Sequence, residues 1–184
     1  MESKKKQITI AGIITFAGGV LNKLGYTNEY IESHYNEWAV EGRKSPNDYL
    51  WYLFNRELNN VEGLTIEQLY NKNSAIYYTM GHFVMKYENG DRNHYTRLAF
   101  EADLNRYVEE SKDSDYQLEV VMVHGNNCEH IRALDGQTRT PQEMLAWQPL
   151  ASRECTNPTG CNCCYSLVPK RDTNGRLVRK SSKD

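Results

Sequence analysis

Residues 116–125, YQLEVVMVHG, mark the point at which the hydrophobic pattern of this chain changes. Apolar side chains alternate there and valine is frequent, which predicts a β-strand that ends at Gly125. A second run with strand character, CNCCYSLVP at residues 161–169, ends at a proline. We expect the two strands to pair as in a β-hairpin, so that Cys128 lies beside the cysteine-rich tract at the start of the second strand.

Short helical segments are predicted between these strands. NNCEHIRALDG at residues 126–136 is typical of a turn and a short helix closed by glycine. Thr140, Pro141 and Glu143 have the order of a capped helix start. Residues 111–170 are therefore interpreted as a small α+β module.

Upstream of this module the pattern is helical. Helix starts are predicted at Ser45 with Pro46 and at Thr65, each before apolar residues at helical spacing. The segment 93–111 carries one apolar stripe with charges opposite it. The predicted fold class is α+β, with a mostly helical part at residues 1–110 that serves as core or docking helices.

The apolar run Ile8–Leu21 follows a lysine cluster, as in a secretion signal. It is too short to span a bilayer and lacks a small-residue cleavage site. We interpret it as a buried helix or a docking segment, and expect no membrane association and no secretion.

The charge balance argues against a protein that coats DNA. The formal net charge of the 184 residues is −2, whereas such proteins are basic overall. Residues 171–184 are nevertheless basic, and we interpret them as a flexible tail. The candidate contacts to nucleic acid are Lys170, Arg171, Arg176, Arg179 and Lys180.

The cysteines are the strongest chemical signal. Five cysteines cannot all pair within one chain, and clustered cysteines without a secretion signal are typical of metal ligands. Side chains alternate along a strand, so Cys161 and Cys163 should share a face and Cys164 should enter the core. The predicted ligands of a structural zinc ion are Cys128, Cys155, Cys161 and Cys163, with His130 in reserve.

Other chemistry has less support in the sequence. A nucleophilic cysteine would need a base, and Cys128 lies near His124 and His130 only in sequence. No P-loop, GxGxxG or HExxH motif is present. A Cys–His hydrolase, a metal-dependent nuclease or toxin, and buried or surface thiols without metal stay open as alternatives.

The order of these parts resembles the C-terminal module of phage Mu F-like head morphogenesis proteins, over about residues 95–170. In that family a helix with a glutamate precedes a strand, a TCxxCxxLxG segment follows, and HPxCRC leads into a last strand that ends in proline. The matching residues here are Glu101, Cys128, Leu134, Gly136, Cys161, Cys163 and Pro169. Ile131 stands in place of the family's second cysteine, and Cys155 near Pro158 in place of its histidine.

The resemblance implies a minor capsid protein without a common enzymatic activity. It would act near the portal in virions or proheads, in the host cytoplasm during assembly, with portal or capsid proteins and packaged DNA as partners. The helical part would then be the docking region. A zinc-containing protein that binds nucleic acid through the basic tail is the alternative interpretation.

Overall fold

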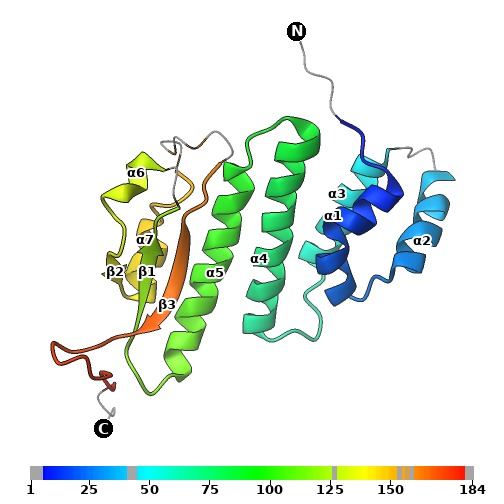
Figure 1. Ribbon diagram of the computed structural model, residues 1–184. Coiled ribbons are helices and arrows are strands. Elements are labelled where there is room, and N and C mark those ends of the chain that lie inside the picture. The colour runs from blue at the N-terminus through cyan, green and yellow to red at the C-terminus, as the bar shows by residue number, and fades with distance from the viewer. Residues whose placement is uncertain are drawn as a thin grey trace.

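The computed structural model describes residues 6–40, 45–125, 128–152, 155, 157 and 160–180. Four helices, a π-helical turn and a long fifth helix precede the sheet, and the α+β prediction is confirmed (Figure 1). These elements are α1 (Ile10–Lys23), α2 (Asn28–Val40), α3 (Pro46–Asn59), α4 (Ile66–Phe83), η1 (Val84–Glu88) and α5 (Asn93–Asp113). The rest are β1 (Leu118–Val123), α6 (Glu129–Arg132), β2 (Thr138–Arg139), α7 (Pro141–Trp147) and β3 (Cys164–Pro169).

Local side-chain hydrogen bonds explain where several helices begin. Thr65 and Gln68 form a reciprocal capping box at the start of α4, and Thr140 and Glu143 form another at α7. The Ser45 hydroxyl accepts a hydrogen bond from the backbone N–H of Asn47, 3.2 Å away. The predicted helix starts are confirmed at these positions.

The sheet is antiparallel with strand order β2-β1-β3. The predicted pairing of the two longer strands is confirmed, with Val121 opposite Ser166 and Val123 opposite Cys164. The two-residue strand β2 was not predicted; it pairs Thr138 with Val121. The second strand also begins later than expected, because Cys161 and Cys163 lie in the loop before it.

Two separate hydrophobic cores divide the described residues. The first core is formed by α1–α4 and includes Ile13, Tyr49 and Phe54. The second core contains Phe100 and Leu104 of α5 together with the sheet and three cysteines. The cores therefore meet where α4 and α5 pack together (Figure 1), and the domain boundary at residue 110 stays a prediction.

The N-terminal apolar run is buried within this chain. Ile13, Ala17 and Leu21 of α1 are at most 1% exposed in the first core. Among the described residues, no helix is both long and apolar enough to cross a membrane.

Residues 170–180 form a hairpin arm, so the expectation of a flexible tail is corrected there. The backbone N–H of Gln117 donates to the Val178 carbonyl at 2.9 Å, and that of Val178 donates to the Lys170 carbonyl at 3.0 Å. The Lys180 ammonium donates to the Ser111 and Lys112 carbonyls at the end of α5. Residues 181–184 lie outside the described residues.

Candidate metal centre

Four of the five cysteines gather at one end of the sheet. Because β1 and β3 are antiparallel, the residues after β1 meet the residues before β3 at the same end, near the start of α5 (Figure 1). Cys128, Cys161 and Cys163 are buried and Cys155 is half-buried. The prediction that Cys128 lies beside the cysteine-rich tract is confirmed.

The thiols of this cluster contact one another. The Sγ atoms of Cys128 and Cys155 are 3.7 Å apart. The Cys163 thiol interacts with those of Cys128 and Cys161, and Cys155 lies near enough to Cys161 for their charges to interact. The structure thus brings together all four sequence-predicted cysteine ligands, which we call the thiol cluster.

Cys164 and His130 lie outside the thiol cluster. The alternation argument separated Cys164 correctly from Cys161 and Cys163, but the prediction that it enters the core is wrong, because it is exposed. It starts β3 on the face opposite the buried Tyr165. His130, the reserve ligand, is exposed on α6.

Backbone N–H groups point at three of the sulfurs. Gly125 donates to Cys163 Sγ at 3.3 Å, and the backbones of Ala151 and Asn157 donate to the sulfurs of Cys161 and Cys155. Such bonds favour the thiolate form. Burial has the larger effect: it raises the pKa of Cys155 to about 11 and also raises the pKa values of Cys161 and Cys163. Burial therefore favours the protonated form of these three thiols, and a metal ion would have to displace their protons.

The donor set fits a soft tetrahedral metal ion. With Zn–S bonds of about 2.3 Å, the sulfurs of a tetrahedral site are about 3.8 Å apart, close to the separation of Cys128 and Cys155. All five thiols are free. Among residues 6–40, 45–125, 128–152, 155, 157 and 160–180, no three His, Cys, Asp or Glu side chains converge closely enough to hold an ion. Metal binding would require the four sulfurs to draw together around one point.

The arrangement does not favour a Cys–His nucleophile. His124 Nε2 lies 2.8 Å from the backbone carbonyl oxygen of Cys128, so the ring engages the backbone of that cysteine. The backbone N–H of His124 donates to Asp135 at 2.7 Å. His124 thus links the loop after β1 to the turn after α6, which is a structural role.

The residues that sequence reasoning missed are Arg92 and Asn93 at the start of α5. The Asn93 Oδ1 atom accepts the backbone N–H of Cys161 at 3.0 Å. Arg92 Nη2 donates to the Cys161 carbonyl at 2.8 Å and to Asn162 Oδ1. No sequence pattern indicated these contacts, because the partners are 68 to 70 residues apart.

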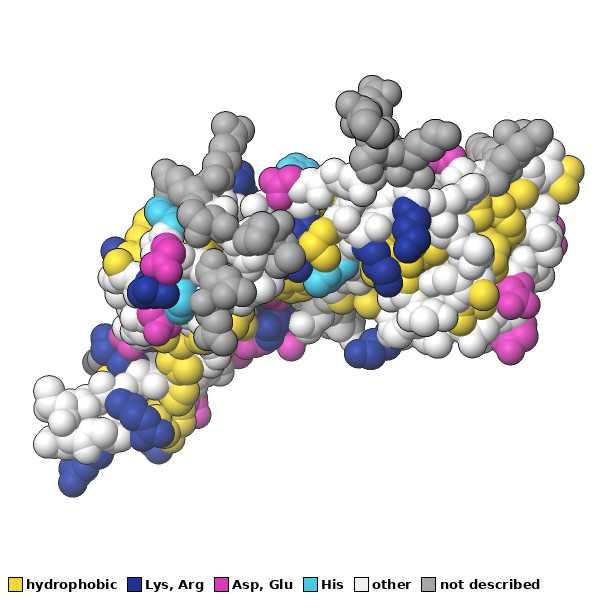
Figure 2. All heavy atoms as spheres, turned by 45° about the horizontal axis from the view of Figure 1, so that its top comes forward, with side chains coloured by type: hydrophobic (Ala, Val, Ile, Leu, Met, Phe, Trp, Pro, Cys, Tyr) yellow, Lys and Arg dark blue, Asp and Glu magenta, His cyan; other side chains and the backbone are white. Residues whose placement is uncertain are grey.

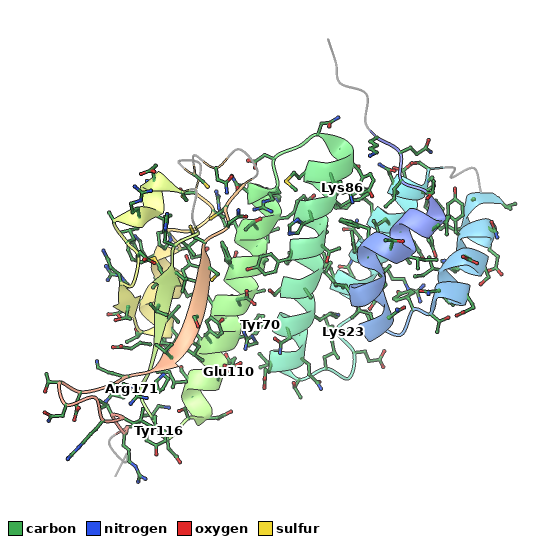
Figure 3. The ribbon with its side chains drawn as sticks, viewed as in Figure 1. Lys23, Tyr70, Lys86, Glu110, Tyr116 and Arg171 are labelled. Carbon is green, nitrogen blue, oxygen red and sulfur yellow. The ribbon has the colours of Figure 1, made fainter. Side chains whose placement is uncertain are left out.

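The basic residues of the arm lie at the opposite end of β3 (Figures 1 and 2). Lys170 pairs with Glu119 at 3.2 Å, and Arg171 donates to the Gly175 carbonyl at 2.7 Å. The Arg179 guanidinium lies 5.7 Å from the centre of the Tyr116 ring. Figure 3 shows Arg171 on this arm and Tyr116 next to the arm, both away from the start of α5. Most of the predicted nucleic-acid contacts thus have partners within the chain, and the nucleic-acid prediction remains untested.

A polar groove of about 1050 Å³ lies under the arm. Lys112, Lys170 and Lys180 line it together with Asp113, Asp115 and Glu119. Mixed charges of this kind do not make the single-sign field that steers nucleic acid.

Comparison with known proteins yields no relative. No protein-family profile, curated protein or solved structure matches this chain.

Proposed function

We propose that this protein is a non-enzymatic assembly protein of a phage head, a minor capsid component near the portal, with a structural zinc ion in its C-terminal module. The observation that supports the proposal is the clustering of the four cysteines Cys128, Cys155, Cys161 and Cys163 at the end of the sheet where β1 ends and β3 begins. Their order relative to α5, β1 and β3 resembles that of the family's motifs, with Ile131 in place of the second cysteine and Cys155 in place of the histidine. The first core supplies the helices for docking.

The chemistry of the cluster favours a structural role for the metal. Four thiolates would fill the coordination sphere of zinc and leave no position for a water molecule or substrate. The second core contains the cysteines themselves, so the ion would add to the apolar contacts that stabilise this module.

Zinc content tests the metal part of the proposal. Protein purified under reducing conditions without added metal should contain about one zinc per chain. The double variant Cys161→Ser, Cys163→Ser should lose it, and the matched control Cys164→Ser should keep it, because Cys164 is exposed outside the cluster. Wild-type protein without zinc, or zinc retained by the double variant, would contradict the proposed site.

Co-expression with a portal protein tests the assembly part. We expect the chain to migrate with the portal ring in size-exclusion chromatography. A zinc-loaded chain that never migrates with portal or capsid proteins would refute the assembly role and leave the metal site standing. Binding to DNA that weakens steeply with salt would favour the nucleic-acid alternative instead.

A further inference from the structure

The backbone N–H and the backbone carbonyl of Cys161 each form a hydrogen bond with one of two consecutive residues, Asn93 and Arg92. Its N–H donates to Asn93 Oδ1 at 3.0 Å, and its carbonyl accepts from Arg92 Nη2 at 2.8 Å. One proposed metal ligand therefore has its backbone fixed by the first side chains of α5.

Arg92 is an unusual residue at this place because it is charged and only 8% exposed. Burying a guanidinium is costly unless hydrogen bonds and an opposite charge compensate it. Within the part of the chain that the structure describes, Arg92 has no ion pair with a carboxylate, and its buried Nε atom has no hydrogen-bond partner. A four-thiolate zinc centre would bring a net charge of about −2 to this end of the module.

Gly160, before β3, leaves space for the Arg92 side chain. Gly160 has φ +84°, and a Cβ atom at that position would lie 2.3 Å from Arg92 Nε. The backbone N–H of Gly160 donates to the Asn157 carbonyl at 2.9 Å. Only glycine allows both the positive φ and the close approach of Arg92.

We propose that Arg92 and Asn93 are positioning residues of the metal centre, which hold the Cys161–Cys163 segment in its ligand conformation. The proposal rests on the zinc site proposed above. Arg92 is bonded to the Cys161 peptide and the Asn162 side chain, so its effect on the sulfurs is transmitted through the backbone. The same contacts connect the metal to α5 and, through the close packing of Arg92 against Gly81, to the end of α4.

The test is a zinc titration against a competing chelator, with Co²⁺ as a spectroscopic probe of the thiolate site. Outer-shell partners of metal ligands typically change affinity about 10- to 100-fold. We expect a loss of that size in Arg92→Met and a smaller one in Arg92→Lys, which keeps the charge but not the planar fork. Asn93→Leu, which removes the acceptor for the Cys161 N–H, should also weaken binding and alter the Co²⁺ spectrum.

Arg106→Met is the matched control. Arg106 is also on α5 and also has a buried Nε without a partner in the described residues, but it pairs with Glu110 and lies over Tyr107. The Arg106→Met variant should bind zinc with the affinity of the wild type. A merely structural role for Arg92 would lower the stability of metal-free and zinc-loaded protein equally and leave zinc affinity unchanged.

The zinc titration gives different results if the positioning role fails and if the zinc site itself is absent. Wild-type affinity and an unchanged Co²⁺ spectrum in Arg92→Met and Asn93→Leu would overturn the positioning role while the zinc site stands. If Arg92→Met does not fold, Arg92→Lys and Asn93→Leu decide the question in the same titration. Absence of zinc binding in the wild type would overturn the metal site, and this inference with it.

Discussion

The two cores of this protein differ in the side chains and contacts that form them. Tyr49, Phe54 and Phe83 in the first core are fully buried large side chains on regular helices. The second core includes three buried cysteines, and the backbone of one of them, Cys161, accepts a hydrogen bond from Arg92 and donates one to Asn93. The first core is stabilised by apolar burial, whereas the second combines apolar burial with these polar contacts and, in our proposal, with a metal ion.

Metal removal should have the largest effect, and only on the second core. With a chelator under reducing conditions, we expect the backbone amides of β1 and β3 to lose protection from hydrogen exchange, while those of α1 and α3 keep it. The loss should amount to several kcal/mol, because zinc binding is coupled to folding in small modules. Equal loss of protection in both cores would contradict the comparison.

Truncation of a large side chain should have the next largest effect, in the first core. Phe54 is 0% exposed, so Phe54→Ala should lower the free energy of unfolding by about 3–5 kcal/mol. Urea denaturation measures this change. Val40→Ala is the exposed control and should change stability by less than about 0.5 kcal/mol. The zinc content of folded Phe54→Ala should match the wild type, and its loss would indicate that the two cores depend on each other.

Deletion of the arm should have an intermediate effect. A chain cut after Pro169 loses the backbone bonds of Gln117 with the arm and the Lys180 contacts to the end of α5. We expect about 1–3 kcal/mol of destabilisation in thermal or urea unfolding. Arg176→Ala, on the exposed turn of the arm, should be neutral. An unchanged unfolding midpoint after the deletion would show that the arm does not contribute to the fold.

The smallest effect is expected at the seam between the cores. Burial raises the pKa of Asp103 on α5, which accepts a hydrogen bond from the Tyr78 hydroxyl of α4 at 3.3 Å. Because the folded-state pKa is raised, the protonated form stabilises the fold at low pH, and this contribution is lost as pH rises through that pKa. Asp103→Asn keeps a hydrogen-bond acceptor at this position. Its free energy of unfolding should therefore be up to about 1 kcal/mol higher than that of the wild type near neutral pH.

Denaturation of both proteins from about pH 4 to about pH 7 measures the difference. The difference in free energy of unfolding between Asp103→Asn and the wild type should become smaller as the pH falls toward about 4. A constant gap, or a variant that is less stable at neutral pH, would refute the assignment of a raised pKa.

Much of the fold could be predicted because its signals are local. Thr65 and Thr140 cap helices through residues three positions away, and alternation in β1 specifies which face is buried. The pairing of β1 with β3 followed from chain order and strand pattern. The four cysteines of the thiol cluster could be named from their residue type and their clustering in the sequence, although Cys161 and Cys163 lie in the loop before β3 and not in the strand that the alternation argument assumed.

Other features of the fold have no local sequence pattern that predicts them. The strand β2 has two exposed residues, too few for a periodic pattern. The arm was interpreted as a tail because its basic composition is typical of solvated ends, yet Lys180 is held by carbonyls 68 and 69 residues away. The exposure of Cys164 depends on the side of β3 that α5 covers, which alternation alone cannot tell.

The sequence by itself determined the helix starts, the two main strands and the set of cysteines in the thiol cluster, because capping, periodicity and residue chemistry act over a few neighbouring positions. Only the tertiary structure decided that α5 belongs to the second core and that Arg92 and Asn93 hold the Cys161 peptide. The reason is physical. A buried arginine needs partners for its donors, and those partners are backbone groups whose position only the folded chain determines.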